Sequence, residues 1–160
     1  MKIVLLDAKT LGKDLDLSCL ETFGDLCIYQ TTTYEETYER IKDATIVITN
    51  KVVIDAQLLE LTPKLQLICV AATGMNNVDL EAAKNNQVVV KNVAGYSTRS
   101  VVQHTFSMAL YLLEKMAYYD HYVQSGAWTK SELFTDVSHP FYEIAGKKWA
   151  LSGWVGLVRR

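Results

Sequence analysis

The segment Gln66-Leu-Ile-Cys-Val-Ala-Ala-Thr-Gly-Met-Asn-Asn-Val-Asp79 contains a strand, a turn and the start of a helix. Residues 66–71 form a short, nearly continuous apolar run, which is typical of a buried parallel strand. Thr73 and Gly74 predict a turn that can present backbone N–H groups to an anion such as a carboxylate. Asp79 has the side chain of a helix N-cap. The segment therefore predicts one strand–helix unit of a parallel sheet.

Similar units lie on both sides of this segment. The other predicted strands are residues 2–7, 25–29, 45–49 and 87–91. Helices are predicted between the strands at residues 15–23 and 80–84. Two more are predicted from their capping residues: one begins at the capping-box pattern of Thr33 and Glu36 and runs through residue 41, and the other begins at Asp55 and runs through residue 61. This alternation predicts an α/β fold with a five-stranded parallel sheet. Ligands bind such sheets beyond the carboxyl ends of the strands, here at Asp7 and at residues 49–50, 72–74 and 92–98.

The sequence changes in character after residue 98. A pattern that starts at Ser97 or Ser100 predicts one long helix to about residue 119, because apolar residues recur there at helical spacing. Residues 124–143 are polar and aromatic and predict an extended arm or loop. Residues 148–151 predict the start of another strand.

The composition excludes several classes of protein. Of 160 residues, 49% are hydrophobic and 21% are charged, and the net charge is −2, which excludes a disordered chain and a basic nucleic-acid-binding surface. No apolar run reaches the roughly 18 residues of a membrane span, and no targeting leader is expected because Lys2 already begins a strand. Cys19, Cys27 and Cys69 lack metal-ligand spacing, so we expect buried thiols, a cytoplasmic location and no metal site.

A second polar segment, residues 92–104, follows the last predicted strand of the sheet. Tyr96 has the length to reach over a neighbouring pocket. Ser97 or Ser100 can equally be a helix cap. A lone histidine within a helix, such as His104, more often supports structure than performs catalysis.

Several motifs together resemble those of one enzyme family. They read ATGMNNVDLEAAK, VKNVAGYSTRSVVQHTFSMALYLL, SGAW and EIAGKKW, in this order. The sequence closely resembles the D-isomer-specific 2-hydroxyacid dehydrogenases, above all the glycerate dehydrogenase and hydroxypyruvate reductase branch, up to Trp149. The resemblance implies a flavodoxin-like substrate-binding (catalytic) domain at residues 1–98. It implies that residues 99–160 comprise a crossing helix, a dimerisation arm and the first strand of an incomplete Rossmann-type NAD-binding domain.

The resemblance also implies roles for individual residues. Thr73 and Gly74 match the turn whose backbone N–H groups hold the substrate carboxylate, and Tyr96 matches a loop position that often faces substrate. Val102 lies where the family approaches the nicotinamide. The implied reaction is hydride transfer between NAD or NADP and a small 2-hydroxy or 2-keto acid, and the implied assembly is a homodimer formed through residues 98–145.

The sequence departs from the family after Trp149. Gly153 and Gly156 leave only G-x-x-G where the family has a glycine-rich nucleotide fingerprint. The family's catalytic Arg, Glu and His have no counterpart in this chain. We therefore expect a truncated or frameshifted N-terminal form of the enzyme that binds no NAD and is inactive by itself.

Two alternatives belong to other functional classes. One is a non-catalytic module that dimerises, with a second copy of itself or with a full-length relative. The other is a phosphoacceptor receiver domain, which shares the five-stranded plan. Asn50 argues against a receiver because an amide cannot accept a phosphoryl group at the end of the third strand, and the acidic pair after the first strand is absent.

Overall fold

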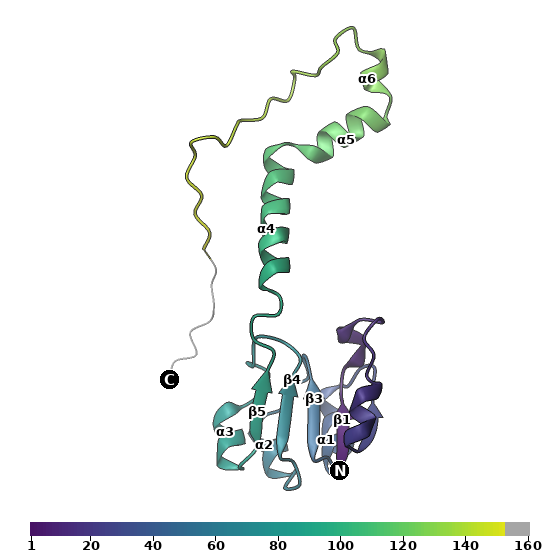
Figure 1. Ribbon diagram of the computed structural model, residues 1–160, viewed down its shortest axis with the longest axis vertical. Helices are drawn as coiled ribbons and strands as arrows, with labels where there is room; N and C mark the ends of the chain where they lie inside the picture. The colour runs from purple at the N-terminus through teal and green to yellow at the C-terminus, as the bar shows by residue number, and fades with distance from the viewer. Residues whose placement is uncertain (153–160) are drawn as a thin grey trace. The chain divides into compact units, whose positions relative to one another are not determined.

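The computed structural model describes residues 1–152, which fall into two compact units divided between Thr98 and Arg99. The first unit contains a sheet of five parallel strands (Figure 1). These are β1 (Lys2–Leu5), β2 (Asp25–Ile28), β3 (Ile46–Thr49), β4 (Leu67–Val70) and β5 (Val89–Asn92). Their order is β2-β1-β3-β4-β5, which is the flavodoxin-like order. The predicted α/β fold with a parallel five-stranded sheet is confirmed.

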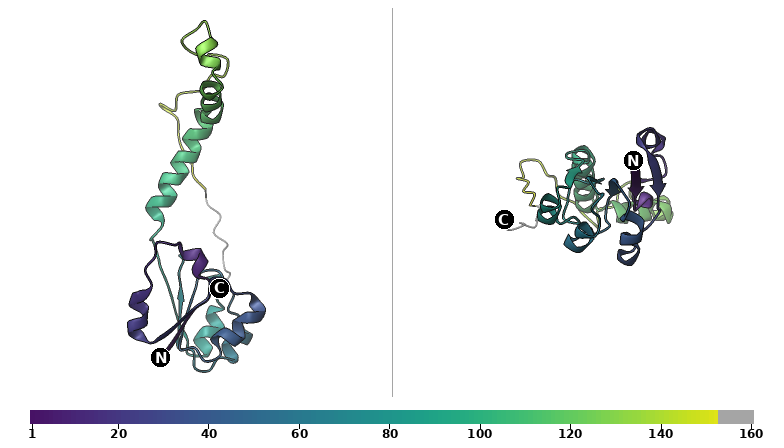
Figure 2. Two further views of the ribbon diagram at one scale, coloured as in Figure 1. Left: turned by 90° about the vertical axis from the view of Figure 1, so that its right-hand side faces the viewer. Right: turned by 90° about the horizontal axis from the view of Figure 1, so that it is seen from below.

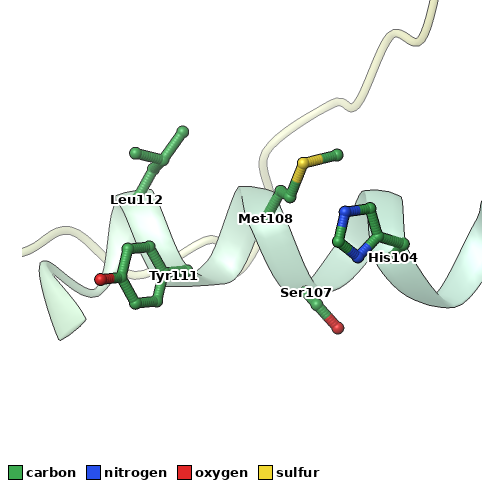
Figure 3. Close-up of a pocket in the computed structure, with 5 residues that line it drawn as sticks. All are labelled: His104, Ser107, Met108, Tyr111 and Leu112. Carbon is green, nitrogen blue, oxygen red and sulfur yellow. The ribbon is translucent and has the colours of Figure 1, made fainter. Parts of the chain in front are cut away.

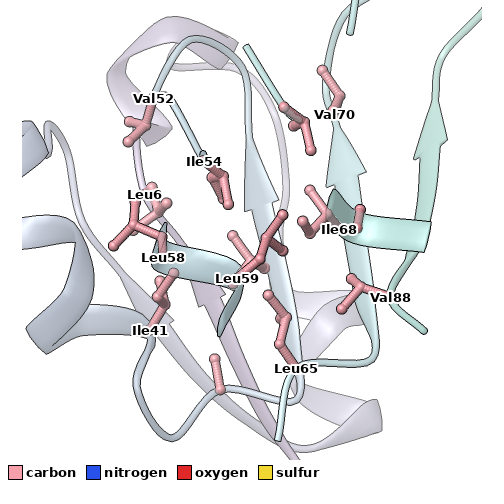
Figure 4. Close-up of a cluster of buried hydrophobic side chains, with 14 of the residues drawn as sticks. Leu6, Ile41, Val52, Ile54, Leu58, Leu59, Leu65, Ile68, Val70 and Val88 are labelled. Carbon is pink, nitrogen blue, oxygen red and sulfur yellow. The ribbon is translucent and has the colours of Figure 1, made fainter. Parts of the chain in front are cut away.

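Three helices pack on one face of this sheet. They are α1 (Tyr34–Ile41), α2 (Ala56–Glu60) and α3 (Leu80–Asn85), and their buried residues share one core cluster with Val4, Val47 and Ile68 of the central strands (Figure 4). The register pairs Val47 with both Val4 and Ile68, so three β-branched or apolar side chains lie side by side. Figure 2 views the sheet and its helices from two further directions.

The predicted helix starts are confirmed by their capping contacts. The Asp55 carboxylate accepts a hydrogen bond from the Leu58 N–H at 3.0 Å, and the Asp79 carboxylate accepts one from the Ala82 N–H at 2.9 Å. At α1, the Thr33 N–H donates to the Glu36 carboxylate at 2.9 Å. Each contact satisfies an N–H group that the first turn of a helix leaves without an intrahelical partner.

The crossover from β1 to β2 differs from the prediction. Residues 15–23 do not form one α-helix; two short 3-10 helices, η1 (Ala8–Leu11) and η2 (Ser18–Phe23), occupy this crossover. No residue of η2 is buried, so this segment has no packed apolar face to stabilise a longer helix.

The second unit contains α4 (Thr98–Leu113), α5 (Met116–Gln124) and α6 (Ala127–Lys130). The predicted single helix to about residue 119 is wrong, because Lys115 adopts a left-handed conformation with φ 52° that ends α4 and starts α5. The predicted arm at 124–143 contains the short helix α6.

Two further predictions fail within the described residues. Residues 148–151 form no strand, since they pair with no other strand in the described part of the chain. The three cysteines are free, but Cys19 is exposed and Cys27 and Cys69 are only half-buried. Gly153 and Gly156 lie outside the described residues. Among residues 1–152, no helix is long and apolar enough to cross a membrane.

The core predicts a clear difference between two substitutions in the sheet. Ile68→Ala is expected to lower the free energy of unfolding by about 2–5 kcal/mol, because Ile68 is fully buried and its truncation leaves a cavity. Val89→Ala, on the edge strand where Val89 is half-exposed, is expected to cost less than about 1 kcal/mol. Urea denaturation followed by circular dichroism measures both values, and similar losses would contradict this assignment of the core.

Candidate functional site

The turn after β4 is the centre of the candidate site. It contains Thr73 and Gly74, both exposed, at the carboxyl edge of the sheet between β4 and α3. The segment that follows β5 lies beside this turn. The structure therefore places the predicted Thr73–Gly74 pair at the edge where parallel sheets bind ligands.

Three hydrogen bonds hold the turn to the segment after β5. The Asn92 side-chain amide donates to the Thr73 carbonyl at 2.7 Å, and the Thr73 hydroxyl donates to the Val93 carbonyl at 3.3 Å. The Val93 N–H donates to the Ala72 carbonyl at 3.1 Å. Sequence reasoning missed the role of Asn92, although an amide side chain at the end of a strand was visible there.

The loop after β3 holds the other side of the turn. The Asn77 side-chain amide donates to the Val52 carbonyl at 3.0 Å, and the Ile54 N–H donates to the Asn77 carbonyl at 2.8 Å. Ile54 also forms an isolated parallel bridge with Val78. Contacts on both sides restrict the conformation of residues 72–78.

The backbone N–H groups within the turn remain available. Among residues 1–152, no acceptor is found for the amides of Thr73, Gly74 and Met75. Gly74 is not in the left-handed region, so its conformation does not require glycine. A Cβ atom added at Gly74 would lie 3.2 Å from the Asn76 side-chain oxygen, a tight contact. Glycine therefore keeps space open beside these amides, and a group of free amides favours an anion.

Asp7 lies buried at the carboxyl end of β1. Its carboxylate accepts the Asn50 N–H at 2.9 and 3.0 Å and the Lys51 N–H at 2.6 Å. These backbone donors occupy the carboxylate that a receiver domain would need exposed for a metal ion. The receiver alternative is therefore disfavoured, and no metal-ligand cluster is found among residues 1–152.

The remaining predicted residues take no part in this hydrogen-bond network among the described residues. Tyr96 is 63% exposed, and within the described residues its side chain makes no hydrogen bond to the turn. Val102 is exposed and belongs to the second unit. His104 lines a groove of about 420 Å³ on α4 together with Ser107, Met108, Tyr111 and Leu112 (Figure 3). All five lining residues come from one helix, so this groove is an open helix surface.

Comparisons with known proteins decide the family. The family model described as D-isomer specific 2-hydroxyacid dehydrogenase, catalytic domain, matches residues 3–147. The chain belongs to this dehydrogenase family. It is 36% identical over 153 residues to a putative 2-hydroxyacid dehydrogenase of Haemophilus influenzae, covering 96% of this chain and 49% of that protein. It is 34% identical over 158 residues to the hydroxypyruvate reductase of Blautia hydrogenotrophica, with the same two coverages.

Solved dehydrogenase structures share the fold. The NAD+-bound 3-phosphoglycerate dehydrogenase of Entamoeba histolytica matches with a TM-score of 0.59 and 25% identity, over 72% of this chain and 40% of that chain. The chain thus spans about half the length of the curated relatives it matches.

The contact between Asn92 and Thr73 can be tested by substitution. Asn92→Ala is expected to lower stability by about 0.5–1.5 kcal/mol, because one hydrogen bond is lost, and to shift the amide NMR signals of residues 73–75. Asn86→Ala is a matched control, because Asn86 donates a similar bond to the Ala82 carbonyl at 2.9 Å before β5 begins. Equal shifts at residues 73–75 in both variants would contradict the anchoring role.

Proposed function

We propose that this chain supplies the substrate-carboxylate site of an NAD- or NADP-dependent D-2-hydroxyacid dehydrogenase. The observation that carries the proposal is the set of free amides at Thr73, Gly74 and Met75, held on both sides at the carboxyl edge of the sheet. The reaction of the whole enzyme is hydride transfer between the nicotinamide and C2 of a small 2-hydroxy or 2-keto acid. The family membership of the chain supports this assignment.

The turn can bind and orient a substrate through its carboxylate. Each amide hydrogen bond to a carboxylate contributes about 1.5–3 kcal/mol, so two of them support binding in roughly the millimolar range. Tyr96 is proposed to face the substrate, because it is exposed on the loop between β5 and α4. Fixing the carboxylate orients C2 for the reaction, which is the contribution of this chain's own residues.

The cofactor is assigned to the proposed enzyme on the strength of its relatives, one of which was solved with NAD+. Val102 is proposed to approach the nicotinamide. Residues 148–151 form no strand, so the described residues do not provide the first strand of a dinucleotide-binding sheet. Because the family's catalytic Arg, Glu and His have no counterpart in this sequence, we expect the isolated 160-residue chain to leave NADH unoxidised with glyoxylate or hydroxypyruvate.

The carboxylate site predicts a ligand titration. Glycolate is expected to bind with a dissociation constant of roughly millimolar size and to shift the amide signals of residues 73–75, because those N–H groups are free. Gly74→Ala is expected to weaken binding by about threefold or more, since the added methyl group crowds the amides and Asn76. Glycolamide, which is neutral, is the control ligand, and Asn86→Ala is the control variant. Equal binding of glycolamide, or unchanged binding by Gly74→Ala, would refute the site.

The second unit supports a further part of the proposal, a homodimer formed through residues 98–145. Large apolar side chains are exposed along α4, including Leu112 at 74%, Val101 at 58% and Met108 at 50%. Figure 3 shows Met108 and Leu112 projecting from the same side of the helix. Covering each such side chain contributes roughly 1.5–3 kcal/mol, and exposed apolar surface of this kind favours self-association. The same exposed surface also favours a second candidate function, that of a non-catalytic module that dimerises.

Substitution of Leu112 tests the homodimer. Leu112→Glu is expected to shift the protein toward monomer, because a carboxylate would have to be buried in the contact. Leu61→Glu, at an exposed position in the first unit, is the matched control and should leave the association unchanged. Sedimentation velocity over a range of protein concentrations measures the proportions of monomer and dimer. A wild-type monomer at every concentration would overturn the proposed dimer.

A further inference from the structure

Asp7 is a buried ionisable side chain whose role the proposed reaction does not explain. It is 4% exposed, and among the described residues no lysine or arginine forms an ion pair with it. Burying a carboxylate away from water is unfavourable unless it accepts hydrogen bonds. Here the Asn50 and Lys51 N–H groups provide them, at 2.6 to 3.0 Å.

Asp7 occupies the point where the strand order of the sheet reverses. β1 connects to β2 on one side, whereas β3 and the later strands extend on the other. In open α/β sheets, ligands bind in the crevice at this reversal. The amides of Asn50 and Lys51 would form an anion site there, but the chain's own carboxylate already fills it. An anion from solution would therefore bind at the next turn along the sheet, at Thr73–Gly74, where the amides are free.

A continuous set of contacts connects Asp7 to that turn. Asp7 holds the amides of Asn50 and Lys51 at the start of the loop after β3. Two residues later, the Val52 carbonyl accepts the Asn77 side-chain amide at 3.0 Å, and the Ile54 N–H donates to the Asn77 carbonyl at 2.8 Å. Asn77 lies three residues after Gly74. The loop of residues 50–54 is thus fixed to β1 at one end and to the turn at the other.

We propose that Asp7 and Asn77 are positioning residues, which hold the loop of residues 50–54 and through it the Thr73–Met75 turn in the conformation that presents free amides to a carboxylate. Neither side chain touches the substrate. Both restrict the backbone of the turn, which is the part that contacts the substrate. The turn is therefore already ordered before the ligand binds, which lowers the entropic cost of binding. The predicted effect on glycolate affinity rests on the proposed function. The predicted effect on the conformation of residues 50–54 and 72–78 does not depend on it.

The test compares Asp7→Asn, Asn77→Ala and a control, Ile41→Val, which trims a buried side chain of α1 distant in sequence from the turn. Asp7→Asn replaces one carboxylate oxygen with an NH2 group that cannot accept a backbone N–H, so one uncharged oxygen is left for the Asn50 and Lys51 amides. We expect hydrogen exchange of residues 50–54 to accelerate by about tenfold, as the loss of one charge-assisted hydrogen bond implies, and glycolate affinity to fall. Asn77→Ala removes the side-chain amide that donates to the Val52 carbonyl and should produce the same two effects. Ile41→Val should lower thermal stability without either effect.

Formate provides a separate test of the filled anion site. Asp7→Ala leaves the Asn50 and Lys51 amides without their carboxylate, so formate should raise its thermal midpoint more than that of wild type. Equal formate effects in both proteins, or unchanged exchange at residues 50–54 in Asp7→Asn, would overturn the positioning role. A third outcome is faster hydrogen exchange in both Asp7→Asn and Asn77→Ala, with no glycolate binding by the wild-type protein. That outcome would support Asp7 and Asn77 as positioning residues and would refute the proposed carboxylate site instead.

Discussion

All five strands of the sheet run in the same direction, and the rest of the first unit depends on this constraint. Each parallel pair needs a crossover over a face of the sheet, and every strand ends at the same edge. α1, α2 and α3 cover one face and bury Val4, Val47 and Ile68. On the opposite face, apolar side chains such as Ile46 and Leu67 remain half-exposed.

Backbone N–H groups gather at the common carboxyl edge of the sheet. Some of them find a hydrogen-bond acceptor within the described residues and others do not. At β1 and β3, Asp7 supplies an internal carboxylate for Asn50 and Lys51. At β4, Asn92 and Asn77 bind carbonyl groups around the turn and leave the amides of residues 73–75 free. Such amides favour a small anion, which is the chemical feature common to 2-hydroxy and 2-keto acids. At this edge, one group of amides binds the protein's own carboxylate, and the other, at residues 73–75, is the one that we propose binds a ligand.

Prediction from the sequence succeeded where the determining contacts are local. Asp55 and Asp79 cap helices because each carboxylate reaches an N–H three residues ahead, and the sequence shows that spacing directly. It failed at Lys115, since the apolar pattern of α4 continues across the left-handed residue that ends the helix. It failed again at residues 148–151, because an apolar run forms a strand only with a neighbouring strand to pair with.

The sequence by itself therefore determined the five strands of the first unit, its three α-helices, the parallel sheet and the position of the Thr73–Gly74 turn. Strand alternation and capping residues carry that information within a few neighbouring residues. Only the tertiary structure decided what surrounds the turn. Asp7 lies 43 residues from Asn50, and Asn77 lies 25 residues from Val52, so their hydrogen bonds form only once the sheet has brought these strand ends together. Which amides are filled and which stay free depends on those distant contacts, and no local pattern encodes them.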